Sequence, residues 1–121
     1  MITKKIDIDG KKYTLTVRRS LIRTIYNIAP RLLKLKDAKN AEEIENSVDG
    51  FEANLDLITN IDILFYEMIK VAHSNISQEK ASEIYDKFDA EYEGAASSLI
   101  ELAMSIFTEG DQAKKKIVWE D

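Results

Sequence analysis

The sequence predicts a mainly α fold, in which a small helical domain carries an N-terminal β-hairpin packed on it (α+β by strict count). An alternating apolar pattern around an Asp-Gly pair predicts the hairpin over residues 2–17. Apolar residues at helical spacing fill most of the remaining chain. The stretch 61–75, IDILFYEMIKVAHSN, is apolar on most sides, so we expect it at the centre of the domain.

Composition and charge indicate a single water-soluble domain. With 121 residues, of which 45% are hydrophobic, the chain fits a single domain over residues 1–109 and a charged C-terminal tail over 110–121. The net charge of −5 argues against nonspecific nucleic-acid binding. Cys is absent, which excludes disulfides and Cys-based metal sites. We find no signal peptide and no membrane-spanning stretch, so we expect a cytoplasmic protein.

The hairpin has a defined register. Asp9-Gly10 favours a type I′ turn, because Gly accepts a positive φ without cost and Asp tolerates it. A two-residue loop at this point pairs Ile6 with Tyr13 and Ile2 with Val17. The apolar face then holds Ile2, Ile6, Ile8, Tyr13, Leu15 and Val17. The polar face holds Thr3, Lys5, Asp7, Lys12, Thr14 and Thr16. A slip of one residue would scatter both sets.

The next two helices are expected over residues 20–35 and 41–48. Ser20 is the expected N-cap of the first. Pro30 removes a hydrogen bond and clashes with the preceding turn, so we expect a kink, or two helical pieces that meet near Ala29. The second helix is short and acidic, and Asp49-Gly50 is expected to break or bend it.

The central helix is expected to be continuous over residues 51–74. Its buried stripe consists of Ile61, Leu64, Phe65, Met68, Ile69 and Ala72, and Leu55 and Ile58 are expected to continue it towards the N-terminus. Ser77 is a good N-cap for a helix over 77–89, with Glu79 in the first turn where the helix dipole favours it. The buried stripe of that helix is Ala81, Ile84, Tyr85 and Phe88.

The last helix is expected over residues 90–108. Its buried face would hold Tyr92, Ala95, Ala96, Leu99, Leu102, Ala103, Ile106 and Phe107. Gly94 weakens its first turns, since a glycine inside a helix costs about 1 kcal/mol relative to Ala. Gly110 is the expected C′ residue that ends it.

Residues with catalytic or metal-binding chemistry are few, and their patterns favour structural roles. Carboxylates cluster at Glu42, Glu43 and Glu45, and again at Asp86, Asp89, Glu91 and Glu93, but without the order of a calcium loop, which favours a solvated surface. His73, the single His, has no second His or Cys to work with, so we expect a packed neutral ring or an imidazolium near a helix C-terminus. Ser97-Ser98 lacks the context of a nucleophile. We therefore expect no catalytic residue, cofactor or metal, and no enzyme.

Two groups of residues are candidates for binding. Arg18, Arg19 and Arg23, with Lys34, Lys36 and Lys39, form a basic group, but nucleic-acid binding needs a more basic domain, so a mixed-charge surface is favoured. In the tail, Lys114-Lys115-Lys116 precedes an apolar group. The apolar segment Ile117-Val118-Trp119 either binds a partner through its aromatic anchor or folds back onto its own domain as an added strand. The candidate partner-binding residues are Ile117, Val118, Trp119, Met104 and Phe107.

One family shares this order of features. The hairpin contains Ile8-Asp9-Gly10-Lys11 followed by Tyr13 and Leu15, the helix ILFYEMIKVAHSN follows in mid-chain, and a Ser-x-Glu helix start comes at Ser77. This order resembles the small tail assembly chaperones of long-tailed (siphovirus-like) phages and prophages of Gram-positive bacteria. The matching stretches are residues 6–17 and 61–88.

The resemblance implies a binding protein that works in the host cell cytoplasm. Members of this family bind the long helical tape measure protein and keep it soluble while tail tube protein polymerises around it. A groove that accepts an amphipathic helix suits that task, and Met68 and Met104 would help such a surface adapt. The alternative is a small helical adaptor or regulatory module. Self-association, as a dimer for example, is compatible with both.

Overall fold

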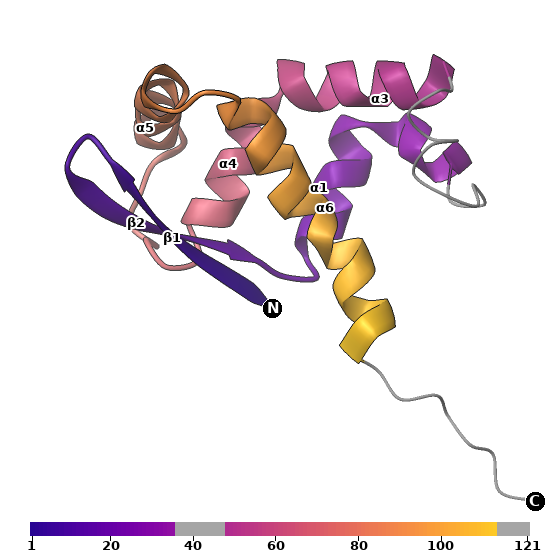
Figure 1. Ribbon diagram of the computed structural model, residues 1–121, viewed down its shortest axis with the longest axis horizontal. Helices are drawn as coiled ribbons and strands as arrows, with labels where there is room; N and C mark the ends of the chain where they lie inside the picture. Colours follow the sequence, from indigo (N-terminus) through magenta and orange to yellow (C-terminus); the bar gives the residue numbers. More distant parts are fainter. Residues whose placement is uncertain (36–47, 114–121) are drawn as a thin grey trace, which may run out of the picture.

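The computed structural model describes residues 1–35 and 48–113 (Figure 1). Strands β1 (Ile2–Ile8) and β2 (Lys11–Val17) form an antiparallel hairpin that packs on the helices. The helices are α1 (Leu21–Ile28), the 3₁₀ helix η1 (Pro30–Leu35), α3 (Val48–Thr59), α4 (Ile61–Ile69), α5 (Gln78–Glu91) and α6 (Ala95–Ala113). The mainly α fold with a packed N-terminal hairpin is confirmed. The helix expected over 41–48 lies outside the described residues, except for Val48, where α3 begins.

The hairpin has the predicted register. Ile6 pairs with Tyr13 and Ile2 pairs with Val17. Asp9 and Gly10 both have positive φ, 52° and 80°, as a type I′ turn requires. Thr16, which belongs to the polar face of the hairpin, is only 4% exposed. The reason is tertiary, because β2 contacts both α4 and α6.

Both outer edges of the hairpin are capped near its turn. In this register the backbone groups of Asp7 and Thr14 point away from the partner strand. The Tyr92 hydroxyl donates a hydrogen bond to the Asp7 carbonyl. The Thr14 N–H donates to Nε2 of His73 over 3.1 Å. His73 is therefore a packed structural residue, and its ring also meets the Tyr13 ring edge-on at 5.6 Å.

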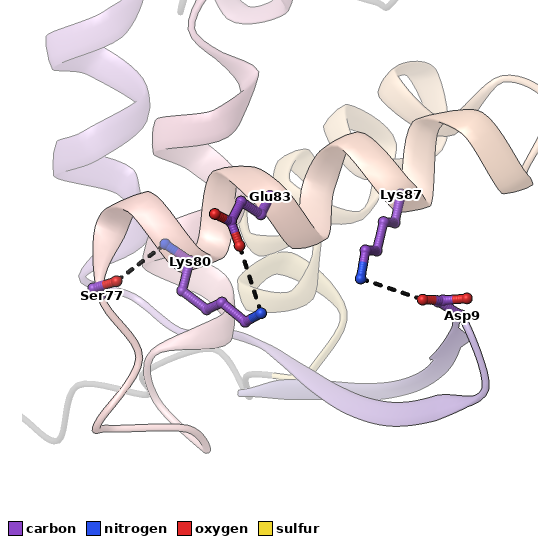
Figure 2. A network of polar contacts seen from close by, with 5 residues as sticks. All are labelled: Asp9, Ser77, Lys80, Glu83 and Lys87. Carbon is purple, nitrogen blue, oxygen red and sulfur yellow. Dashed lines mark hydrogen bonds and ion pairs between the residues drawn. The ribbon is translucent and has the colours of Figure 1, made fainter.

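The turn of the hairpin is fixed to the C-terminal half of α5. The Asp9 N–H donates to Oε2 of Glu91 over 2.8 Å. The Lys87 ammonium lies 3.2 Å from the Asp9 carboxylate (Figure 2). At the other end of α5, the Ser77 hydroxyl accepts a hydrogen bond from the Lys80 N–H over 3.0 Å, which confirms the predicted N-cap (Figure 2).

Helix α4 occupies the centre of the molecule, as predicted. It contacts β2, α1, α3, α5 and α6 (Figure 1). Its side chains Leu64, Phe65, Met68 and Ile69 are fully buried. The Phe65 ring lies edge-on to Tyr85 at 5.5 Å and stacks on Phe88 at 6.1 Å, so α4 and α5 share an aromatic cluster. The predicted buried stripe of α5 is confirmed in full.

The prediction of one continuous helix over 51–74 is wrong. The helical segment is divided at Asn60 into α3 and α4 (Figure 1). The backbone of Asn60 has φ −111°, and its side-chain amide donates to the Asp56 carbonyl over 3.0 Å. This local hydrogen bond stabilises the end of α3, because an Asn side chain competes with the backbone for the hydrogen bonds that would continue the helix. Gly50 does not break a helix as expected, because α3 begins at Val48 and runs through it.

The remaining helix ends differ from the predictions in part. Pro30 separates α1 from η1 as expected, whereas Ser20 sits at the N-cap of α1 without a side-chain hydrogen bond. Helix α6 begins at Ala95 rather than at residue 90, because Gly94 adopts a positive φ of 68° in the turn after α5. Tyr92 therefore precedes the helix and is exposed. Gly110 lies inside α6, which continues to Ala113, so the prediction of a C′ residue there is wrong.

Replacing Gly10 with Ala tests the turn. Apart from Gly10 and its two chain neighbours, no residue comes within 4 Å of the position that a Cβ on Gly10 would take, so the cost is conformational alone. We expect Gly10→Ala to lower the free energy of unfolding by about 1 kcal/mol in urea denaturation. Gly10→Asn is the matched control and should lose less, since Asn tolerates positive φ. Equal losses in the two variants would contradict the assignment of a type I′ turn.

Candidate partner-binding surface

An apolar stripe on α3 is exposed. Phe51, Leu55 and Ile58 are 61%, 45% and 41% exposed, and they recur at the i, i+4, i+7 spacing that places them on one helix face. Ala53 and Leu57 lie on another face of the same helix and are buried. We call Phe51, Leu55 and Ile58 the α3 stripe.

The break at Asn60 explains why this stripe is outside the core. In a continuous helix, Leu55 and Ile58 would extend the stripe of α4, as the sequence predicts. That prediction is wrong, because α3 leaves the direction of α4 at Asn60 and lies across one end of the molecule (Figure 1). Only the face with Ala53 and Leu57 is then covered.

A hollow continues from the C-terminal end of the stripe. Helices α3, α4, α5 and α6 all contribute to its lining, which consists of Ile58, Ile61, Asp62, Ser82, Tyr85, Asp86, Asp89 and Ala96. We call this the acidic hollow. Ile58 belongs to both the stripe and the hollow, so the two form one continuous surface.

The hollow has a negative electrostatic character. Burial, together with the negative charges of Asp89, Asp86 and Asp62, raises the pKa of the Tyr85 hydroxyl to about 12. The Ser82 hydroxyl donates to Asp62 over 3.3 Å. Within residues 1–35 and 48–113, none of the three carboxylates forms an ion pair. The surface therefore offers an apolar stripe that ends beside uncompensated negative charge.

Two members of the basic group, Arg19 and Arg23, line a separate hollow at α1. That hollow is lined by Arg19, Ser20, Ile22, Arg23, Tyr26 and Asn27. Arg18, Arg19 and Arg23 are exposed, as a mixed-charge surface requires. Lys36 and Lys39 lie outside the described residues.

Of the predicted partner-binding residues, Met104 and Phe107 lie away from this surface. Met104 and Phe107 are half-buried on α6 and pack against the core, and the Phe107 ring meets Tyr26 of α1 edge-on at 5.8 Å. Neither belongs to the α3 stripe or to the acidic hollow. Ile117, Val118 and Trp119 lie outside the described residues. Their roles in binding stay a prediction.

Sequence reasoning missed the α3 stripe as a surface. Phe51 was given no role, and Leu55 and Ile58 were assigned to the core. A signal was present, because Thr59 and Asn60 are adjacent poor helix formers at the point where the break occurs. The acidic hollow had no comparable signal, since Asp62 and Asp86 are far apart in the sequence.

Other chemistry is limited in the part of the chain that the structure describes. There, no group of three or more His, Asp or Glu side chains is placed to hold a metal ion. No helix among these residues has the length and apolar character needed to cross a membrane. Glu42, Glu43 and Glu45 are not described, while Asp86, Asp89, Glu91 and Glu93 are exposed, as the sequence predicted.

Comparison with known proteins does not add to this picture. No protein-family model, curated protein or solved structure matches the chain. The function must therefore be argued from the surface and from the sequence.

The raised pKa of Tyr85 predicts a pH dependence of stability. Between pH 10.0, its ordinary pKa, and about 12, the unfolded chain loses this proton and the folded chain keeps it. Unfolding then releases a proton, so the contribution of Tyr85 to the free energy of unfolding is complete below pH 10.0 and falls as the pH rises. Urea denaturation on both sides of pH 10.0 should show a steeper fall for the wild type than for Tyr85→Phe. Parallel curves would contradict the shift.

Proposed function

We propose that this protein is a phage tail assembly chaperone that binds the tape measure protein and keeps it soluble during tail assembly. The observation that supports this function best is the continuous surface formed by the α3 stripe and the acidic hollow. The resemblance of residues 6–17 and 61–88 to this chaperone family supplies the choice of partner.

The surface suits an amphipathic helix. Phe51, Leu55 and Ile58 present about two helical turns of apolar side chains, which can pack against the apolar face of a second helix. A Lys or Arg on that helix, placed beyond its apolar face, would meet Asp86 and Asp89 at the end of the stripe. The apolar stripe supplies burial, and the carboxylates select the orientation and the charge of the helix.

The proposal makes the chain a binding protein and not an enzyme. It acts in the host cell cytoplasm before the tail is complete, it shields apolar helices of the tape measure protein, and it releases them as tail tube protein polymerises. A helical adaptor or regulatory module is the second candidate, because the same stripe would accept an amphipathic helix of any origin. Neighbouring genes for tail tube and tape measure proteins would separate the two.

The test places one charge on the stripe. We expect Leu55→Asp to lose capture of the tape measure protein by about tenfold or more, since binding would bury an unpaired carboxylate against apolar surface. Asn54→Asp adds the same charge at an exposed neighbouring position and should keep capture. The measurement is affinity capture from the native host under prophage induction, read by mass spectrometry.

Circular dichroism melting of both variants controls for unfolding. Capture that is equal in Leu55→Asp and Asn54→Asp would overturn the binding surface. Capture by the wild type of host regulatory proteins alone would overturn the chaperone function and favour the adaptor.

A further inference from the structure

The chain carries a segment whose chemistry complements its own exposed surface. The α3 stripe is apolar and ends at three carboxylates without ion-pair partners among the described residues. The C-terminal segment has the opposite charge and the same apolar character, since Lys114-Lys115-Lys116 is followed by Ile117-Val118-Trp119. Three cations next to an aromatic anchor match three carboxylates next to an apolar stripe.

The length of α6 limits how close the chain that follows it can come to the acidic hollow of its own copy. Ala96, at the start of α6, lines the hollow, and the helix continues to Ala113. At about 1.5 Å per residue, α6 carries the chain roughly 25 Å beyond Ala96. From Ala113 to Lys116 an extended chain spans at most about 11 Å. Figure 1 shows α6 leading away from α5. A reach of about 11 Å from Ala113 is therefore too short to bring Lys116 back to the hollow of the same copy.

We infer that a second copy of this chain supplies the occupant: the segment 114–119 of one copy docks on the α3 stripe and acidic hollow of another. The lysines face Asp62, Asp86 and Asp89, and Trp119 packs on the stripe. Because the two contacting patches differ, the contact is heterologous. It covers the apolar surface in the free protein and is displaced when a helix of higher affinity arrives.

This inference concerns the surface named in the proposed function but holds for any partner of that surface. Electrostatic attraction and apolar burial would both stabilise the contact between the two copies. The carboxylates of Asp86 and Asp89 are exposed, so added salt should weaken the contact by screening. A docked segment would also lower the exposed apolar area that otherwise favours nonspecific association.

Site-directed crosslinking tests the contact, because the natural chain has no Cys. Asn54→Cys places a thiol beside the stripe, and Glu120→Cys places one beside Trp119, so both recognition elements stay intact. The two full-length variants are mixed with different tags and allowed to oxidise. Glu120→Cys with Lys5→Cys, an exposed residue on the outer face of the hairpin, is the matched control.

We expect disulfide formation between copies to be roughly fivefold faster or more for Asn54→Cys than for Lys5→Cys. Equal rates would overturn the inference. The double variant Asn54→Cys/Glu120→Cys should link one copy to another. A product linked only within one chain would place the segment on its own copy and would also overturn it.

Charge exchange gives a second readout. Adding Asp86→Lys/Asp89→Lys to the Asn54→Cys chain, or Lys115→Glu/Lys116→Glu to the Glu120→Cys chain, should each slow crosslinking. Combining the two changed chains should restore it, since opposite charges face each other again. If combining the two changed chains does not restore the rate of crosslinking, the role of the carboxylates is overturned. These experiments contain no tape measure protein, so their failure is distinguishable from failure of the proposed function.

Discussion

The burial of α4 is the constraint on which the other elements depend. Leu64, Phe65, Met68 and Ile69 have no exposed surface, and each is worth roughly 1.5–3 kcal/mol when buried, so together they contribute on the order of 10 kcal/mol before chain entropy is subtracted. Covering all sides of one short helix requires the hairpin, α1, α5 and α6 to pack around it. The hairpin is then held by the His73 and Tyr92 contacts at its edges.

The same constraint creates the surface. Helix α4 is only nine residues long and begins at Ile61, because the break at Asn60 separates it from α3. Two apolar stripes that would be collinear in one long helix are thereby separated. One fills the core, and the other, on α3, stays in contact with solvent at a length suited to a helical partner.

The charged residues make the two ends of this surface different, because the carboxylates lie at only one of them. The acidic hollow lies at one end of the α3 stripe, while the hollow that contains Arg19 and Arg23 is formed by other residues. A net charge of −5 would repel copies of the chain from one another in general. A basic segment at the C-terminus overcomes that repulsion at one place only. The apolar stripe and the carboxylates therefore act together as a docking surface for a cationic, apolar segment.

The sequence by itself determined the elements whose causes are local. The type I′ turn, the register of the hairpin, the N-cap of α5 and the division at Pro30 follow from backbone preferences of single residues, and the apolar content of 61–69 was enough to place α4 at the centre. Tertiary structure alone decided the exposure of the α3 stripe, the burial of Thr16 and the meeting of Asp62 with Asp86 and Asp89. The physical reason is that helical periodicity reports which residues share a face but not whether a neighbour covers that face. An apolar stripe in the core and an apolar stripe on the surface have the same pattern until the packing of the chain separates them.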